Sequence, residues 1–360
     1  MVQIALKPTV DQRQVERFCQ DILPQVSRTF ALSIRFLPGN LGRAVLCGYL
    51  LARIADTLED DLVATIETKL ELLDHFLACF EDPTCANAFP AAVSKLEGEK
   101  AHLYLVENTD LVFALYRSLP PQSQQTLQHW LTEMVQGMQK FIKLHTQGIR
   151  IQTLDEYKEY CYYVAGTVGH LLSDLWYEHS PSVDFQTYHI LRQTCAAFGE
   201  GLQTVNILKD IAWDAEHENS IYVPQSCLQA HGSSHSTLLH PDYLSQNHAA
   251  IKSLVELAWS DLDKAAEYLI SVPRAAIPIR LFCILPLVFA YATLRDITAS
   301  TAMLHSGGNV KISRAEVKSL IMVSPLTVVS NFAIGRLIAQ VRQQPFLWRS
   351  KANPINEEII

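Results

Sequence analysis

The segment CGYLLARIADTLEDD (residues 47–61) joins an apolar stretch to a dense acidic end, and the fold must accommodate both. Its first half is apolar apart from Arg53, and its last six residues carry four carboxylates. In a helix, Asp56, Glu59 and Asp60 are spaced i, i+3, i+4 and project from one face. Such a patch alone is also typical of a solvated helix end. Because the preceding residues are apolar on nearly all sides, we expect the carboxylates to face a cavity.

A second acidic cluster lies in the segment GEGLQTVNILKDIAWDAEHENSIYVP (residues 199–224). Asn206, Asp210 and Asp214 recur every four residues and form one stripe of a helix, with Gln203 close to the same line. Oxygen ligands without His or Cys suit a hard cation such as Mg²⁺, which completes its shell with water and substrate phosphate. The two clusters together predict a site for Mg²⁺ and a diphosphate, against the competing interpretation of coincidental surface acidity.

Composition and periodicity indicate one large helical domain. Hydrophobic residues make up 49% of the 360-residue chain and charged residues only 18%, which is enough apolar side chain for a large core and an apolar pocket. Apolar residues recur at spacings of three and four almost throughout, and no linker divides the chain. We therefore expect a single all-α domain over residues 1–360, a helical bundle around a large central apolar cavity.

The charge balance and the cysteines limit the partners and the compartment. The formal net charge of −8 gives no reason to expect nucleic acid, and it argues against a strongly basic membrane-binding face. Eight cysteines without CxxC pairs, and a start without a signal peptide, predict free thiols in the cytoplasm. The apolar stretches 281–294 and 320–335 are shorter than the roughly 20 residues that a spanning helix needs, so we expect no transmembrane anchor. Nothing in the sequence indicates an obligatory protein partner.

A diphosphate beside an apolar pocket suggests ionisation of an isoprenoid substrate. Mg²⁺ neutralises a diphosphate leaving group and so promotes heterolysis of the C–O bond to an allylic carbocation, which must be kept from water. A fifteen-carbon tail at about 0.8 kcal/mol per buried CH₂ would gain on the order of 10 kcal/mol of burial free energy. Burial of the tail would provide binding affinity, and the metal would promote departure of the diphosphate.

At these residues the chain resembles the squalene and phytoene synthase family, head-to-head prenyltransferases with the all-helical isoprenoid-synthase fold. The resemblance spans a core of about residues 20–340 and rests on five segments: SRTFALSIRFLP (27–38), YLLARIADTLEDD (49–61), YCYYVAGTVG (160–169), GLQTVNILKDIAWD (201–214) and FCILPLVFAYATL (282–294). It implies that the chain is a prenyltransferase of this fold.

Within the family, DTLEDD, YCYYVAG and the late NVKISR (309–314) resemble the squalene-forming members. The resemblance implies that two farnesyl diphosphates condense to presqualene diphosphate, which is then reduced with NADPH to squalene. Two alternatives stay open: a non-reductive relative that makes presqualene diphosphate, dehydrosqualene or phytoene, and a non-catalytic helical assembly or binding factor. The retained carboxylates argue against the second alternative. A peripheral membrane contact for product release is a further expectation.

The resemblance also implies a role for each matching residue. The expected magnesium ligands are Asp56, Glu59, Asp60, Asn206, Asp210 and Asp214. The expected diphosphate-binding residues are Ser27, Arg28, Arg53, Lys209 and Gln203. Tyr160 matches the tyrosine that removes a proton or stabilises the cation in the first half-reaction, and Tyr49 and Phe282 match aromatic positions that face the carbocation. Lys311 and Arg314 match the positions that support NADPH binding.

The chain departs from the family pattern at three places. Lys209 stands where the family often has an arginine, which removes a bidentate phosphate contact. Asn219 and Ser220 stand where an arginine usually precedes an aromatic residue, and the sequence leaves open whether His217 substitutes for it. No GxGxxG follows a strand, so NADPH would bind without a Rossmann unit.

Overall fold

The computed structural model describes residues 11–348, which form helices and loops without a named strand. The α-helices of the first half are α1 (Gln12–Val26), α2 (Arg28–Ile34), α3 (Gly39–Asp60), α4 (Ile66–Ala78), α5 (Pro83–Ala92), α6 (Lys100–Val106), α7 (Thr109–Arg117), α8 (Pro121–Leu144), α9 (Leu154–Cys161) and α10 (Thr167–His179). The later ones are α11 (Phe185–Leu191), α12 (Cys195–His217), α13 (Gln225–Ala230), α14 (Leu244–Ala250), α15 (Lys252–Ser271), α16 (Ile277–Thr298), α17 (Arg314–Thr327) and α18 (Asn331–Gln343). Short elements are the π-helix η1 (Tyr162–Gly166) and the 3₁₀-helices η2 (His235–Thr237), η3 (Pro241–Tyr243) and η4 (Ala302–Leu304). The expected all-α bundle is confirmed.

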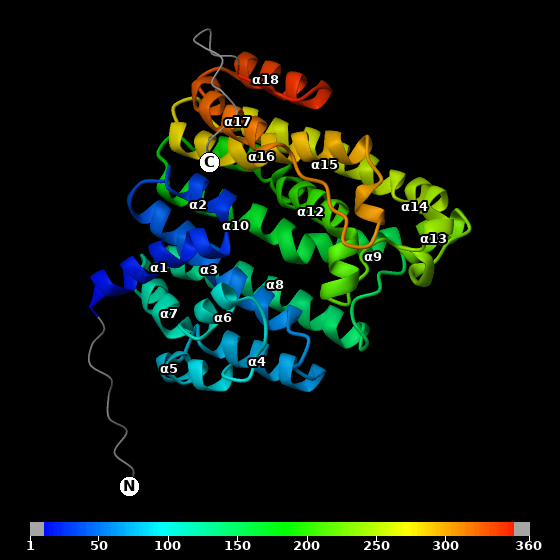
Figure 1. Cartoon of the computed structure of the whole chain (residues 1–360). Coiled ribbons are helices and arrows are strands. Elements are labelled where there is room, and N and C mark those ends of the chain that lie inside the picture. Colours follow the sequence, from blue (N-terminus) through cyan, green and yellow to red (C-terminus); the bar gives the residue numbers. More distant parts are fainter. Residues whose placement is uncertain (1–10, 349–360) are drawn as a thin grey trace, which may run out of the picture.

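The helices are stacked from one end of the molecule to the other (Figure 1). α4 and α5 lie at one end, α3, α8, α10 and α12 lie in the middle, and α17 and α18 cover the opposite end beyond α15 and α16. The two helices that carry the acidic clusters, α3 and α12, both contact α10. The middle layer therefore brings segments from distant parts of the chain into one core.

Glycines allow the helices around η1 to approach closely. A Cβ atom on Gly169 of α10 would lie 1.9 Å from the carbonyl oxygen of Cys195, and one on Gly199 of α12 would lie 2.0 Å from that of Ala165. Any side chain at either position would push α10 and η1 away from α12. The π-helix itself is an irregularity of the kind that often occurs at functional sites.

α16 differs from its expected length. The apolar stretch 281–294 belongs to α16, which has 22 residues. Among the described residues, α16 is the one helix that is long and apolar enough to cross a membrane. However, 78% of its most apolar stretch is buried inside the protein. Its Arg280 is fully buried and donates hydrogen bonds to the carbonyl oxygens of Val272 and Val328. These features are typical of a core helix.

Candidate active site

The two acidic clusters line one polar cavity. The last turns of α3 and the middle of α12 face each other across a space of about 250 Å³. The predicted site residues around it are Arg53, Asp56, Glu59, Asp60, Tyr160, Gln203, Asn206, Lys209, Asp210 and Asp214. Folding therefore joins residues that are far apart in the sequence into a single oxygen-rich site.

Each cluster contains one cation that pairs with its first carboxylate. On α3, Nη1 of Arg53 lies 3.5 Å from Oδ2 of Asp56, and its Nη2 donates to the Tyr49 hydroxyl at 3.4 Å. On α12, Nζ of Lys209 pairs with Oδ2 of Asp210. The Arg53 guanidinium also lies 5.9 Å from the Tyr49 ring centroid, so this cation is anchored on an aromatic face.

The other carboxylates lack such compensation. Burial, followed by repulsion from Asp60 and Asp56, raises the pKa of Glu59 well above its usual value, and its Oε1 is buried without a hydrogen-bond partner. Burial and then the Glu218 carboxylate raise the pKa of Asp60. Burial, Glu218 and neighbouring aspartates raise the pKa of Asp214 to about 9. The site therefore has more carboxyl groups than its own cations can keep ionised.

The donor set fits Mg²⁺ bound together with a diphosphate. Within residues 11–348, no three His, Cys, Asp or Glu side chains converge as a preformed metal cage. Mg²⁺ does not require one, because it is usually held by one or two carboxylates while substrate phosphates and water complete the octahedron. The unpartnered Glu59 oxygen and the raised pKa of this carboxyl group are consistent with a site that a hydrated divalent cation would complete.

An apolar cavity of about 180 Å³ adjoins the polar one. Both are lined by the shared residues Arg53, Asp56, Val164, Gln203 and Asn206. The predicted aromatic residues belong to the apolar side: the Phe30 ring lies 5.3 Å from Tyr49 and 6.4 Å from Phe282, measured between ring centroids. A molecule with a charged head at the acidic clusters would thus place an apolar tail against aromatic rings.

The structure distinguishes the three tyrosines of the YCYYV run. Tyr160 lines the polar cavity, and its hydroxyl donates to the Tyr222 hydroxyl at 3.3 Å. Burial, followed by the Glu59 carboxylate, raises its pKa well above the usual value, so the phenol stays neutral. Tyr162 instead donates to Glu133 at 2.8 Å, and the Tyr163 ring packs against a glycine of α8. Only the first tyrosine of the run is placed at the acidic clusters.

Four predicted residues lie outside the linings of these two cavities. The Ser27 hydroxyl caps α2 by accepting a hydrogen bond from the Phe30 amide at 3.2 Å, and Arg28 is exposed in the first turn of the same helix. Lys311 and Arg314 are exposed before and at the start of α17. Their expected roles stay predictions.

Sequence reasoning missed Glu218 and Tyr222, which also line the polar cavity. A signal for Glu218 was present, because it continues the four-residue stripe of Asp210 and Asp214. Tyr222 is positioned by backbone pairing next to it: the Ile221 amide donates to the Ile149 carbonyl at 2.8 Å. That pairing joins two loops from distant parts of the chain, which no local pattern indicates.

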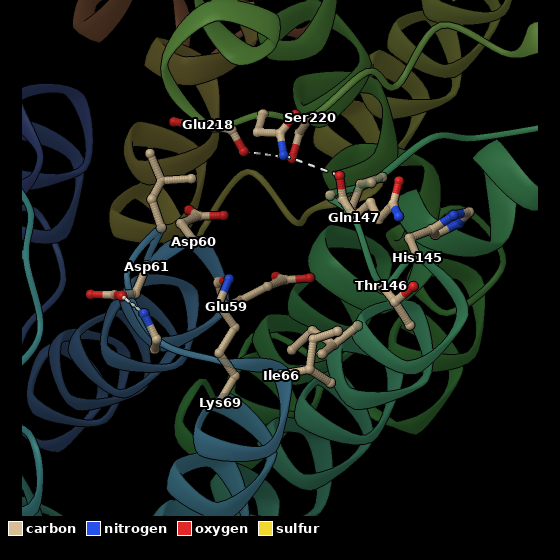
Figure 2. A pocket seen from close by; sticks show the side chains of 16 residues that line it. Glu59, Asp60, Asp61, Ile66, Lys69, His145, Thr146, Gln147, Glu218 and Ser220 are labelled. Carbon is tan, nitrogen blue, oxygen red and sulfur yellow. Dashed lines mark hydrogen bonds between the residues drawn. The ribbon is translucent and has the colours of Figure 1, made fainter.

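Figure 2 shows a second polar cavity, of about 210 Å³, that shares Glu59, Asp60 and Glu218 with the first. The Glu59 carboxylate points into it, and Lys69 from α4 donates to the Glu59 backbone carbonyl at 2.5 Å. His217, the residue that the sequence left open as an arginine substitute, is exposed and stacks on Trp213 with ring centroids 3.9 Å apart. Of Lys69 and His217, only Lys69 lines this second cavity together with Glu59 and Asp60.

These features define a class of protein: an all-α bundle in which two acidic helices share a polar cavity that is continuous with an apolar one. The chain belongs to the squalene/phytoene synthase family, whose sequence profile matches residues 23–316.

Relatives and solved structures agree with this assignment. The squalene synthase of Schizosaccharomyces pombe is 29% identical over 86% of this chain and 65% of its own length, and squalene synthase 1 of Arabidopsis thaliana is 26% identical over 77% and 64%. The chain thus spans slightly less than two thirds of these relatives. The structure of TcSQS with the ligand BPH1237 superposes with a TM-score of 0.78 at 24% identity, covering 92% of this chain and 98% of the other. This similarity confirms the fold.

Proposed function

We propose that the protein is a squalene synthase, a Mg²⁺-dependent prenyltransferase that joins two farnesyl diphosphates head to head and reduces the product with NADPH. The observation that carries this proposal is the shared lining of the two cavities. A diphosphate would lie at Arg53, Gln203 and Asn206, and the isoprenoid tail would extend toward Phe282. The names of the relatives, squalene synthases of fungal, plant and mammalian origin, support the same activity.

Different residues would bind the metal and the diphosphate. The side chains that would hold Mg²⁺ are Asp56, Glu59, Asp60, Asn206, Asp210 and Asp214. When bound, Mg²⁺ supplies neutralisation of the diphosphate leaving group. Arg53 would bind the diphosphate from its anchored position on Tyr49, and Lys209 would exchange its contact with Asp210 for a phosphate oxygen. Ser27 and Arg28, which lie outside the linings of these two cavities, would add contacts to the diphosphate.

Tyr160 would act in the first half-reaction. As its neutral hydroxyl takes the proton that leaves when the cyclopropane ring closes, it can pass its own proton through the Tyr222 hydroxyl toward the carboxylates of the cavity; alternatively, its oxygen can stabilise the neighbouring cation. The rings of Tyr49 and Phe282 present π-faces that stabilise a carbocation without adding to it. The apolar lining excludes water, which would otherwise quench the cation.

Reduction with NADPH is a more specific proposal than the condensation of two farnesyl diphosphates. Lys311 and Arg314 would bind the phosphates of NADPH, and their exposed positions leave them accessible to a soluble cofactor. The free thiols of all eight cysteines are consistent with a cytoplasmic location.

The test is product analysis of the purified protein with farnesyl diphosphate and Mg²⁺, with and without NADPH. We expect squalene only in the reaction with NADPH, and presqualene diphosphate in its absence. The same C30 product in both reactions would overturn the reductive step while keeping the condensation. No consumption of farnesyl diphosphate in either reaction would overturn the proposed substrate.

A further inference from the structure

The last turn of α3 brings two kinds of negative charge together. It carries Glu59 and Asp60, and the helix ends at Asp60. The last four carbonyl groups of a helix have no partner within the helix, and they carry partial negative charge. The next residue, Asp61, has φ −57° and ψ 126°, so the chain turns away from these carbonyl groups. The carbonyl dipoles and the carboxylates therefore need a donor or a cation beside them.

Lys69 of α4 supplies that donor. Its Nζ donates a hydrogen bond to the Glu59 carbonyl at 2.5 Å, and Figure 2 shows its side chain extending toward Glu59. A lysine that bonds the last carbonyl groups of a helix stabilises the helix end. Burial lowers the pKa of Lys69, and the carboxylates of α3, Asp60 and Glu59 first, act in the opposite direction. The ammonium group thus lies among the acidic side chains while it bonds the backbone.

The start of α4 fixes the backbone of this lysine. The Thr65 hydroxyl caps the helix by accepting from the Thr68 amide at 3.2 Å, and the Lys69 amide donates to the Thr65 carbonyl at 2.9 Å. One turn later, Leu72 and Leu73 are buried in the core, and α4 contacts both α3 and α8. Because its backbone is held in this way, only the lysine side chain has to be ordered to reach α3.

Lys69 differs from the other cations of the site in the group that it contacts. Within residues 11–348, the Lys and Arg side chains that line the two polar cavities are Arg53, Lys209 and Lys69. Arg53 and Lys209 pair with carboxylate oxygens. Lys69 donates to a backbone carbonyl instead, and Oε1 of Glu59 is buried without a partner. Lys69 therefore supports the last turn of α3 and leaves that oxygen free for a metal ion.

We infer that Lys69 is a positioning residue for Mg²⁺: its hydrogen bond holds the last turn of α3 so that the Glu59 and Asp60 carboxylates face the polar cavities. The inference rests on the proposed function in taking these two carboxylates as magnesium ligands. Groups that hold metal ligands in place typically contribute roughly 10- to 100-fold to metal affinity. A purely electrostatic role predicts the opposite sign, because removing a cation beside the site would strengthen Mg²⁺ binding.

The test is thermal unfolding of the full chain over a range of Mg²⁺ concentrations, without substrate. A ligand that binds the folded state raises Tm, so the concentration dependence reports Mg²⁺ affinity. Lys69→Met keeps the apolar stem but removes the donor, and it should raise the Mg²⁺ concentration for half of the Tm rise by at least roughly tenfold. Lys69→Arg keeps a charged donor and should stay within about threefold of wild type.

The matched control is Lys140→Met. Lys140 pairs with Glu159 and lines neither polar cavity, so its loss removes one positive charge without touching α3. This control should bind Mg²⁺ like the wild type. The Tm without Mg²⁺ separates a loss of stability from a loss of metal binding. If Lys69→Met does not fold, Lys69→Gln takes its place in the same comparison.

Mg²⁺ binding by Lys69→Met that equals or exceeds that of the wild type would overturn the inference, even if its Tm without Mg²⁺ is lower. The absence of any Tm rise with Mg²⁺ in the wild type would do the same. Product analysis keeps this inference apart from the proposed function. The expected order of Mg²⁺ affinities without consumption of farnesyl diphosphate would refute only the proposed substrate, whereas squalene formation with unchanged Mg²⁺ binding in Lys69→Met would refute only the role of Lys69.

Discussion

The acidic clusters of α3 and α12 meet at one cavity but balance their charge differently. On α3, Arg53 is fixed by the ring and hydroxyl of Tyr49 while it pairs with Asp56. On α12, Lys209 pairs with the adjacent Asp210 through a flexible stem. Each cluster keeps further carboxylates without a cation of their own. The comparison shows that both clusters hold more carboxyl groups than cations, whereas only the cation of α3, Arg53, is held in place by an aromatic residue.

The largest effect should come from removing one carboxylate from either cluster. Asp56→Asn and Asp210→Asn should each lower turnover of farnesyl diphosphate at least roughly 10³-fold, because each would remove charge that holds Mg²⁺ beside the leaving group. Turnover would be measured over a range of Mg²⁺ concentrations, with circular dichroism to verify folding. Wild-type-like turnover in either variant would show that its cluster holds no essential metal.

Asp61 provides the matched control for that experiment. It follows the α3 cluster directly, but its Oδ1 accepts from the Val63 amide at 2.9 Å and its Oδ2 from the Glu97 amide at 2.8 Å. Asp61→Asn should therefore lower the free energy of unfolding by about 1 kcal/mol and leave turnover nearly unchanged.

The next largest effect concerns the tyrosine between the clusters. Tyr160→Phe should slow formation of presqualene diphosphate by roughly 10²-fold, because it removes the hydroxyl beside the acidic cavity. Tyr162→Phe, which removes the hydrogen bond to Glu133 outside that cavity, should leave the rate within about threefold of wild type. A single-turnover assay would follow the first half-reaction. Equal rates for the two variants would move the proton-transfer role away from Tyr160.

A smaller effect should separate the two cations. Arg53→Lys should raise KM for farnesyl diphosphate by roughly tenfold, since lysine loses the fork geometry and stacks less well on Tyr49. Lys209→Arg should keep KM within about threefold, because Lys209 is not anchored on an aromatic ring and arginine can also bind phosphate. A larger rise in KM for Lys209→Arg than for Arg53→Lys would show that the preorganised diphosphate-binding cation is Lys209 on α12, not Arg53 on α3.

The smallest effect concerns a partly buried carboxylate on α12 that lines neither cavity. Burial, followed by the Asp261 carboxylate, raises the pKa of Glu200 from 4.5 to about 7. The folded state therefore binds this proton more tightly than the unfolded state, and the free energy of unfolding falls as pH rises from 4.5 to about 7. Glu200→Gln should remove this slope and stabilise the protein by about 1–2 kcal/mol at pH 8, allowing for partial solvent exposure.

Urea unfolding at several pH values would measure that slope. Mg²⁺ should not relieve the destabilisation by Glu200, whereas it should stabilise the wild-type protein through the acidic clusters. A wild-type pH profile unchanged by Glu200→Gln would show that this carboxyl titrates normally.

The sequence by itself determined the helical character and the two acidic stripes. Spacings of three and four residues place Asp56, Glu59 and Asp60 on one helix face, and Asp210 and Asp214 on another, wherever those helices lie. Family resemblance added the expectation that the residues of both stripes are magnesium ligands. The first inference depends on helix geometry and the second on the identity of the motif residues. Both can be read from the sequence of one chain.

Only the tertiary structure decided which side chains share the cavity. It added Glu218 and Tyr222, gave Asp61 a structural role, and placed Lys69 at the Glu59 carbonyl. The physical reason is that side-chain direction within one helix follows from backbone geometry, whereas contacts between helices depend on how distant segments pack.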